Sequence, residues 1–303
     1  MRFSIWPGYQ QPWADVLALA RHADTTGWDG LWIADHFRGD GSAFGAESAP
    51  VLESTAQLSA LAAATGRVRL GPLVLGTTYR HPAVLAKWAV TTDHIADGRL
   101  TLGLGAGWQE NEHRRYGIDL PPLRDRVDRF AEVCEVTASL LRDERTTFKG
   151  RWFELDEAWC EPGPLQQPLP LLIGGKGDRM LGVVARWADA WNMWGLPATI
   201  AERASALDRA CERIGRDPAT ISRSAQALVM LTDDRDRAAE LVRAAAPRAV
   251  VAGPATHLAD VVAEWQAVGV DEVIVPDFVL GTGSRRLDAM NEIIESVAPS
   301  FRS

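Results

Sequence analysis

The stretch RVRLGPLVLGTTYRHPAVLAKWAVTTDHIADGRLTLGLG, residues 67–105, contains a strand, a helix and a second strand in direct succession. The short apolar runs at 67–76 and 99–105 are typical of buried strands. Residues 82–98 predict a helix, because Pro82 suits a first helical position and Asp97-Gly98 suits a stop. Two strands joined through a helix run parallel in one sheet, so this stretch indicates a parallel α/β fold.

The same alternation of strands and helices continues on both sides of this stretch. Further strands are predicted at 2–6, 30–34, 170–175, 189–195, 221–230 and 271–276. Further helices are predicted at 13–27, 53–66, 123–142, 178–188, 199–214, 234–246, 257–268 and 285–297. The alternation is interrupted only before the fifth strand, by an insertion at about 144–169 that resembles a small hairpin followed by a proline-rich crossing.

Eight strands, nearly all followed by a helix, favour one particular α/β architecture. Eight βα units within about 250 residues are typical of a (β/α)8 TIM barrel. The alternative, an open doubly wound sheet, usually has a glycine-rich phosphate loop directly after its first strand. Here PGYQQP, residues 7–12, follows that strand and carries no such signal. We therefore expect a single α/β domain over residues 1–303, a TIM barrel with an insertion before strand five.

Composition excludes several classes of protein. The 303 residues are 47% hydrophobic and 24% charged, as in ordinary globular proteins. The net charge of −8 argues against nucleic acid or anionic lipid as a partner. No apolar run resembles a signal peptide or reaches the length of a membrane span, which predicts a cytoplasmic protein without a membrane partner. The three cysteines, Cys134, Cys160 and Cys211, are far apart in the chain, which predicts neither a disulfide framework nor a structural zinc site.

The segment GLWIADHFRG, residues 30–39, ends an apolar strand on a carboxylate and an imidazole. Active sites of TIM barrels form at the C-terminal ends of the strands, where Asp35 and His36 would lie. His36 is therefore a candidate general acid or base. The alternative interpretation is that Asp35 caps a turn and His36 is a polar residue on the rim.

The segment GGKGDRM, residues 174–180, is a candidate anion site. Consecutive glycines let backbone N–H groups approach a ligand, and the first turn of the following helix offers free donors. Lys176 and Arg179 add positive charge. The alternative is a tight turn with solvated side chains, and the segment does not match the P-loop pattern.

Other common chemistries lack their motifs. The six histidines form no metal-binding pattern such as H-E-x-x-H, and no G-x-S-x-G motif is present. We therefore predict no metal. An acid/base histidine, an anion-binding loop and aromatic residues near strand ends suit a bound cofactor that supplies redox chemistry, with the protein supplying orientation and a proton.

Four blocks of the sequence resemble one known family. They are LWIADHF (31–37), the long block from LVLGTTYRHP to PPLRDRVDRF (73–130), PLLIGGKGDRMLGVVARWADAWNMW (170–194) and VAGPATHLADVVAEWQAVGVDEVIVPD (251–277). In this order they are similar to the luciferase-like oxidoreductases, and among these to the branch that uses the deazaflavin coenzyme F420. The resemblance implies a barrel with an insertion before strand five, in agreement with the strand count.

The resemblance also implies a cofactor site. His36 would exchange a proton beside the cofactor ring, and a non-prolyl cis peptide would press on that ring near Leu73 and Val74. The turn after strand five and the start of the next helix would hold the phosphate. The implied cofactor-binding residues are Asp35, His36, Leu73, Val74, Asn111, Gly174, Gly175, Lys176, Gly177, Arg179 and Met180.

Two departures from the related sugar-phosphate dehydrogenases bear on the substrate. Trp108 stands where those enzymes have an acidic glutamate, and FRGD follows His36 without the tryptophan found there. These departures predict an apolar or aromatic substrate rather than a sugar phosphate. The predicted substrate pocket consists of Trp6, Trp108, Trp194 and Phe278.

Three hypotheses of function follow from the resemblance. The first is hydride transfer between F420 and a small organic substrate, with His36 as proton donor or acceptor. The second is a monooxygenase that uses FMN and O₂. The third is a non-catalytic protein that binds deazaflavin. Family members are often dimers, which implies a homodimer.

Overall fold

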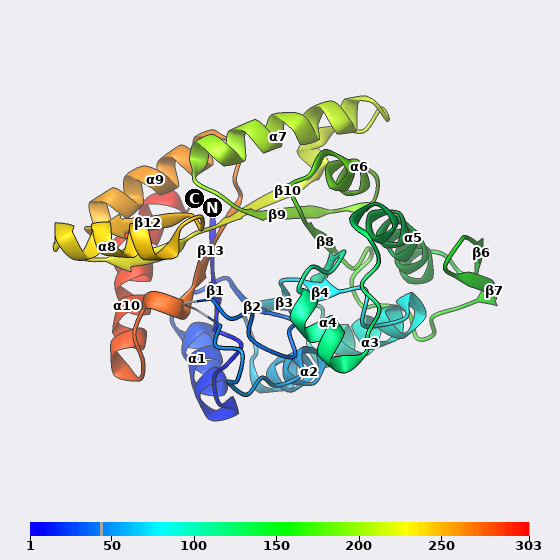
Figure 1. Cartoon of the computed structure of the whole chain (residues 1–303), viewed down its shortest axis with the longest axis horizontal. Helices are drawn as coiled ribbons and strands as arrows, with labels where there is room; N and C mark the ends of the chain where they lie inside the picture. Colours follow the sequence, from blue (N-terminus) through cyan, green and yellow to red (C-terminus); the bar gives the residue numbers. More distant parts are fainter. Residues whose placement is uncertain (43–44, 303) are drawn as a thin grey trace.

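The computed structural model describes residues 1–42 and 45–302, and its centre is a sheet of parallel strands (Figure 1). The sheet has the order β3-β2-β1-β13-β10-β9-β8-β5-β4. Its strands are β1 (Arg2–Trp6), β2 (Gly30–Ile33), β3 (Arg69–Pro72), β4 (Leu75–Gly76), β5 (Leu102–Gly105), β8 (Leu171–Gly174), β9 (Ala190–Trp194), β10 (Ser222–Gln226) and β13 (Glu272–Pro276).

The sheet closes on itself through its two end strands. β3 and β4 lie at opposite ends of the strand order, yet only Leu73 and Val74 separate them in the chain. β3 pairs with β2 and β4 pairs with β5, and every pairing in this sheet is parallel. Eight strand positions therefore form a barrel. The TIM-barrel prediction is confirmed, and the open doubly wound alternative is wrong.

Helices surround the barrel because each buries one apolar face against the strands (Figure 1). In α5, for example, Val127, Phe130, Cys134 and Leu141 are buried at helical spacing. The helices are α1 (Trp13–Thr25), α2 (Ser54–Ala64), α3 (Pro82–Ile95), α4 (Glu110–Tyr116), α5 (Leu123–Arg142), α6 (Asp178–Trp187), α7 (Pro197–Glu212), α8 (Arg235–Ala245), α9 (Ala255–Ala267) and α10 (Ser284–Ser296).

The expected strand at 67–76 is divided by a cis peptide bond between Leu73 and Val74. This bond confirms the feature that the resemblance implied. The backbone bulges here toward β5, where two glycines make room for it. A Cβ at Gly103 would lie 2.0 Å from the Pro72 carbonyl oxygen, and one at Gly105 would lie 2.6 Å from Cγ2 of Val74. Gly103 and Gly105 therefore accommodate the neighbouring strand.

Two other expectations at the C-terminal end of the barrel were incomplete. The predicted strand 221–230 is divided into β10 and β11 (Leu228–Leu231), and β11 leaves the barrel to pair with β12 (Val250–Gly253), which was not predicted. α4 lies between the predicted strand 99–105 and the predicted helix 123–142, where no helix was predicted. Both additions lie above the strand ends and build the rim of the barrel.

The segment at 144–169 contains an antiparallel hairpin of β6 (Thr146–Lys149) and β7 (Glu154–Ala158). Figure 1 shows the hairpin at the right-hand edge, outside the ring of helices. Buried Asp93 of α3 accepts hydrogen bonds from the backbone N–H groups of Leu165 and Gln166, at 2.9 and 3.1 Å. The crossing is thereby held against the barrel, away from the strand ends.

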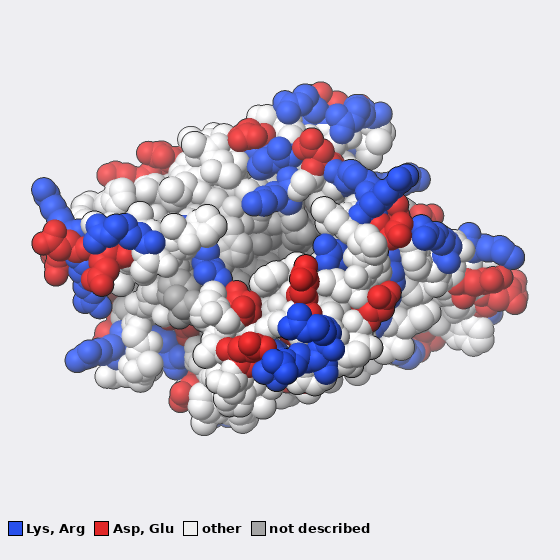
Figure 2. Space-filling model, viewed as in Figure 1, with Lys and Arg blue, Asp and Glu red and all other residues white. Residues whose placement is uncertain are grey.

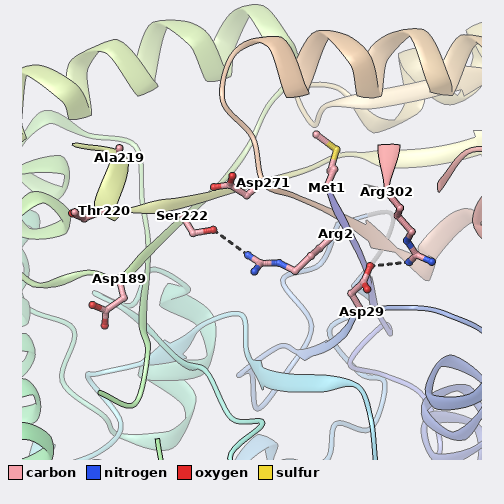
Figure 3. Close-up of a pocket in the computed structure, with 9 residues that line it drawn as sticks. All are labelled: Met1, Arg2, Asp29, Asp189, Ala219, Thr220, Ser222, Asp271 and Arg302. Carbon is pink, nitrogen blue, oxygen red and sulfur yellow. Dashed lines mark hydrogen bonds and ion pairs between the residues drawn. The ribbon is translucent and has the colours of Figure 1, made fainter. Parts of the chain in front are cut away.

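A hollow at the N-terminal end of the barrel is lined by charges that bind one another (Figure 3). Arg302 pairs with Asp29 at 2.8 Å, and Arg2 donates to the Ser222 hydroxyl at 3.0 Å. Asp189 pairs with Arg142 at 2.8 Å. These groups connect strand starts to one another, so this end of the barrel has a structural role.

Three further observations concern the described residues only. None of their helices is long and apolar enough to cross a membrane. No cluster of three or more acidic, histidine or cysteine side chains there could hold a metal ion. The three cysteines are free thiols.

Candidate functional site

A cavity of about 780 Å³ opens at the C-terminal ends of the barrel strands. Its size is ordinary for a cofactor or small-molecule site. Figure 2 shows a hollow near the middle of the face in view, with a mostly uncharged wall and charged side chains around its rim. The cavity is lined by twelve of the residues that the sequence predicted: Trp6, Asp35, His36, Leu73, Val74, Trp108, Gly174, Gly175, Lys176, Met180, Trp194 and Phe278.

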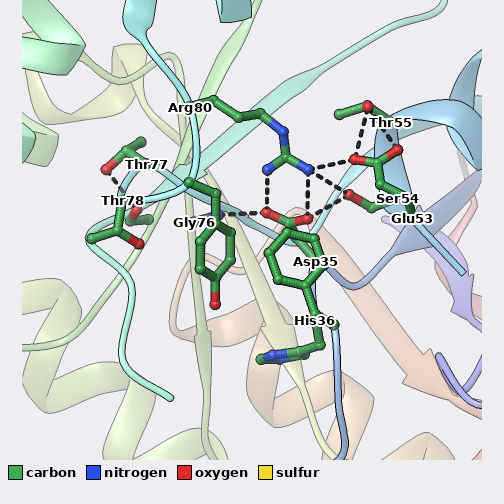
Figure 4. Close-up of polar contacts among 12 residues, drawn as sticks. Asp35, His36, Glu53, Ser54, Thr55, Gly76, Thr77, Thr78 and Arg80 are labelled. Atoms are coloured by element: carbon green, nitrogen blue, oxygen red, sulfur yellow. Dashed lines mark hydrogen bonds and ion pairs between the residues drawn. The ribbon is translucent and has the colours of Figure 1, made fainter. Parts of the chain in front are cut away.

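Asp35 at the end of β2 binds protein groups through both carboxylate oxygens (Figure 4). Oδ2 accepts from Arg80 at 2.6 Å and from the backbone N–H of Gly76 at 2.8 Å. Oδ1 accepts from the Ser54 hydroxyl at 2.6 Å and from Arg80 at 3.0 Å. Asp35 thus connects the end of β2 to β4, directly beyond the cis peptide, and its carboxylate has little capacity left for a ligand.

Arg80 itself is held by a second acid. Its guanidinium donates to Glu53 at 2.5 Å, just before α2. Burial would lower the pKa of Arg80, but its bonds to Asp35 and Glu53 outweigh that effect and raise the pKa. Arg80 is therefore a fixed cation that joins the loop between β4 and α3 to both ends of the loop between β2 and α2.

His36, the next residue after Asp35, binds a buried acid through one ring nitrogen. Its Nδ1 lies 2.9 Å from Oε1 of Glu112, which is fully buried on α4. Oε1 also accepts from the Tyr79 hydroxyl. Oε2 accepts from the backbone N–H groups of Phe37 at 2.7 Å and Arg38 at 3.3 Å. Burial would raise the pKa of Glu112, but the hydrogen bond and charge of His36, followed by the bonds from Tyr79 and Phe37, outweigh it and hold the pKa below its usual range.

Two aromatic rings fix the plane of the His36 imidazole. The Tyr9 ring lies 5.1 Å away, centroid to centroid, and Trp108 meets the imidazole edge-on at 5.6 Å. Burial, and then the charge of Asp40, raises the pKa of Tyr9 to about 12, so Tyr9 is neutral at physiological pH. Trp108 is 60% exposed and lies at the mouth of the cavity, over His36.

One half of the cavity wall, here called the glycine wall, is formed by the ends of β5 and β8 and carries two cations. Lys176 follows β8, and Arg126 projects from α5. Neither side chain has a hydrogen bond or ion pair within the described parts of the chain. The backbone of this wall is formed by Gly105, Ala106, Gly107, Gly174 and Gly175.

The opposite half, here called the aromatic wall, is formed by the ends of β1, β9, β10 and β13. The Trp6 ring packs 5.8 Å from Trp194 and 5.4 Å from Phe278. Gln226, at the end of β10, is only 4% exposed, and its Oε1 is buried without a donor among the described residues. This wall is largely apolar: besides Gln226 it carries the Asn192 amide of β9, which donates to the Ser224 hydroxyl at 2.9 Å.

The comparisons with known proteins agree with this geometry. A family model described as luciferase-like monooxygenase matches residues 1–270. The chain belongs to that family. An F420-dependent glucose-6-phosphate dehydrogenase of Kineococcus radiotolerans is 32% identical over 242 residues, which are 77% of this chain and 69% of that protein. An F420-dependent hydroxymycolic acid dehydrogenase of Mycobacterium tuberculosis is 28% identical over 285 residues, 90% of this chain and 76% of that protein.

Solved structures extend the similarity to the whole fold. An F420-dependent secondary alcohol dehydrogenase in complex with an F420–acetone adduct superposes with a TM-score of 0.85. The two chains are 20% identical, and the match covers 98% of each. A coenzyme F420-dependent tetrahydromethanopterin reductase from Methanopyrus kandleri has a TM-score of 0.82 at 18% identity, with 99% of each chain covered. At these identities the likeness shows the luciferase-like barrel fold.

Three predicted cofactor residues lie outside the cavity wall that the described residues form. Asn111 of α4 donates to the Gly39 carbonyl at 2.8 Å and accepts from Gln109 at 2.8 Å, so its amide braces the loop after β2. Arg179 points outward and pairs with Asp128 on α5. Gly177 precedes α6 and does not line the cavity.

Sequence reasoning missed several residues that line the cavity, above all Glu112. A signal was present: ENEHRRYG, residues 110–117, has acids at its start, bases at its end and a final glycine, as expected of a short helix. A helix predicted there would have a buried face, and Glu112 lies on that face. The other missed lining residues include Tyr9, Tyr79, Arg126, Asn192 and Gln226.

Proposed function

We propose that this protein transfers a hydride between coenzyme F420 and a small organic substrate with an apolar or aromatic body. The observation that carries this proposal is a single cavity whose two unlike walls meet at an imidazole. Related luciferase-like proteins of about 30% identity that are named F420-dependent dehydrogenases support the choice of cofactor.

The glycine wall fits F420. Glycine backbone allows the close approach of a flat ring, and Leu73 and Val74 lie on the same side of the cavity. F420 carries a phosphate and an acidic tail, and the two cations of this wall, Arg126 and Lys176, have no acidic partner among the described residues. The donor set of this wall therefore matches the charge of the cofactor.

When bound, F420 supplies the carbon that gives or takes the hydride. His36 moves the proton: it delivers one to the substrate during reduction and removes one during oxidation. The aromatic wall holds the substrate body and excludes water, while Trp108 covers the mouth of the cavity beside His36. The chain's own contribution is thus orientation, exclusion of water and the transfer of one proton.

A titration of the apoprotein with F420, and separately with FMN, tests the proposal by fluorescence. We expect tight binding of F420 and weak binding of FMN. A preference for FMN would replace the proposal with an FMN monooxygenase, and oxygen uptake would become the assay. Binding of neither cofactor would remove both functions. Tight binding of F420 without turnover of any substrate would favour a non-catalytic deazaflavin-binding protein.

A further inference from the structure

Every group that contacts the Glu112 carboxylate can act as a hydrogen-bond donor. The backbone N–H groups of Phe37 and Arg38 are donors only, and they occupy Oε2. The Tyr79 hydroxyl donates to Oε1. The bonds from the two backbone N–H groups and from Tyr79 do not depend on the charge of His36, and they favour the ionised carboxylate, so Glu112 has no proton to give to His36.

The protonation of the imidazole follows from this. His36 Nδ1 lies 2.9 Å from Oε1 of Glu112, and an ionised carboxylate can only accept. Nδ1 must therefore carry a hydrogen. In the neutral ring the second nitrogen, Nε2, is then a bare acceptor, and Nε2 has no protein partner among the described residues. His36 lines the cavity with this nitrogen unbound.

We propose that Glu112 is a positioning residue that holds neutral His36 in the Nδ1–H form, so that Nε2 is the nitrogen that exchanges the substrate's proton. The proton exchange with the substrate rests on the proposed function, whereas the tautomer of His36 does not. Nε2 accepts a proton during oxidation of the substrate and donates one during reduction, while Nδ1 stays bonded to Glu112 throughout.

Glu112 also positions the backbone around His36. Its Oε2 binds the two residues that follow His36, while α4 carries Glu112 itself. One side chain thus sets both the path of the loop and the form of the ring. Other ionisable groups around the imidazole include Tyr9 after β1, Asp35 and Asp40 after β2, Tyr79 and Arg80 after β4, and Arg248, which lines the same cavity.

The isosteric variant Glu112→Gln should switch neutral His36 to the other tautomer. The amide oxygen is best placed on the two backbone N–H donors, because the amide nitrogen cannot accept from them. The NH₂ group then faces Nδ1 and donates to it. Neutral His36 must now carry its hydrogen on Nε2. A change of one heavy atom therefore moves the available lone pair away from the cavity.

Nitrogen NMR of histidine-labelled apoprotein tests this form directly, and His36→Gln assigns the signal. At a pH where the ring is neutral, we expect a protonated Nδ1 and a bare Nε2 in the unaltered protein, and the reverse in Glu112→Gln. Glu110→Gln is the matched control, since Glu110 is exposed on the same helix and should leave the signal unchanged. A hydrogen on Nε2 in the unaltered protein would overturn the proposal, even if Glu112→Gln does not fold.

Diethyl pyrocarbonate, which reacts with a bare imidazole nitrogen, gives a second measurement. Mass spectrometry of the peptide that contains His36 should show modification about tenfold slower in Glu112→Gln, because Nε2 then lacks its lone pair in most molecules. Equal rates in the two proteins would contradict the assignment. Neither experiment needs F420, so failure of the proposed function and failure of this inference are distinguishable: only the former follows from absent cofactor binding.

Discussion

The two walls of the cavity differ in the kind of polar side chain that has no hydrogen-bond or ion-pair partner. On the glycine wall, Arg126 and Lys176 have no acid beside them among the described residues; on the aromatic wall, the Gln226 amide is unpaired. At the opposite end of the barrel, charges such as Arg302 and Asp29 bind one another. Paired charges hold strands together, whereas unpaired groups that face a cavity are available to a ligand. The comparison supports the proposal that an anionic cofactor binds to one wall and a largely apolar substrate to the other.

A substitution of His36, which lies where the two walls meet, should reduce turnover more than any other change considered below. His36→Asn removes the proton donor and acceptor, so kcat should fall about 10²–10⁴-fold, the range for loss of a general acid or base. The dissociation constant of F420 should change little. Stopped-flow measurement of F420 oxidation or reduction, with the best substrate from a screen, gives both values. Unchanged turnover would show that the walls enclose a site without this acid/base step.

Asp35, the neighbour of His36, tests the opposite case, a side chain whose carboxylate oxygens are bonded within the protein. Asp35→Ala leaves Arg80 buried without its main partner and should lower the free energy of unfolding by about 3–5 kcal/mol. Urea denaturation measures this loss. Glu53→Ala is the control: Glu53 is a more exposed partner of the same arginine and also caps α2 by accepting from the Ala56 N–H, so its loss should cost about 1–2 kcal/mol, less than the loss of Asp35. Equal losses would contradict the anchoring role of Asp35.

Arg126 tests the glycine wall itself. Arg126→Ala should raise the dissociation constant of F420 about tenfold or more, since a hydrogen bond to a charged group contributes about 1.5–3 kcal/mol. Arg179→Ala should leave F420 binding nearly unchanged, because Arg179 pairs with Asp128 outside the cavity. Fluorescence titration at constant ionic strength compares the two variants. A larger effect at Arg179 would restore it as the anion ligand that the sequence suggested.

Gln226 tests the aromatic wall, and its substitution should have the smallest effect on F420 binding. Gln226→Leu should change the dissociation constant of F420 by less than about twofold. Stability should be unchanged or slightly higher, because a buried amide without a partner is removed. Thermal unfolding and F420 titration measure the two quantities. If F420 binding weakened tenfold, the cofactor would extend to both walls.

Much of the architecture could be predicted from the sequence because it depends on local signals. Apolar runs and helix stops along the chain indicated the barrel. Since all parallel strands end at one rim, the same reasoning placed His36, Lys176 and Trp194 around one cavity. The division of 221–230 was missed, because no local signal tells a strand when to leave its sheet.

The sequence by itself determined the barrel and the end at which its cavity lies, and it provided His36 as the candidate acid/base residue. Tertiary structure alone decided which polar groups are engaged. Nothing in the sequence distinguishes the side chains of Arg179 and Arg126. In the structure Arg179 pairs with Asp128, whereas Arg126 lines the cavity. Glu112 lies 76 positions from His36, and only the packing of α4 over β2 brings them to 2.9 Å. Hydrogen bonds act over a few ångströms, so the partners depend on distances that closure of the barrel sets.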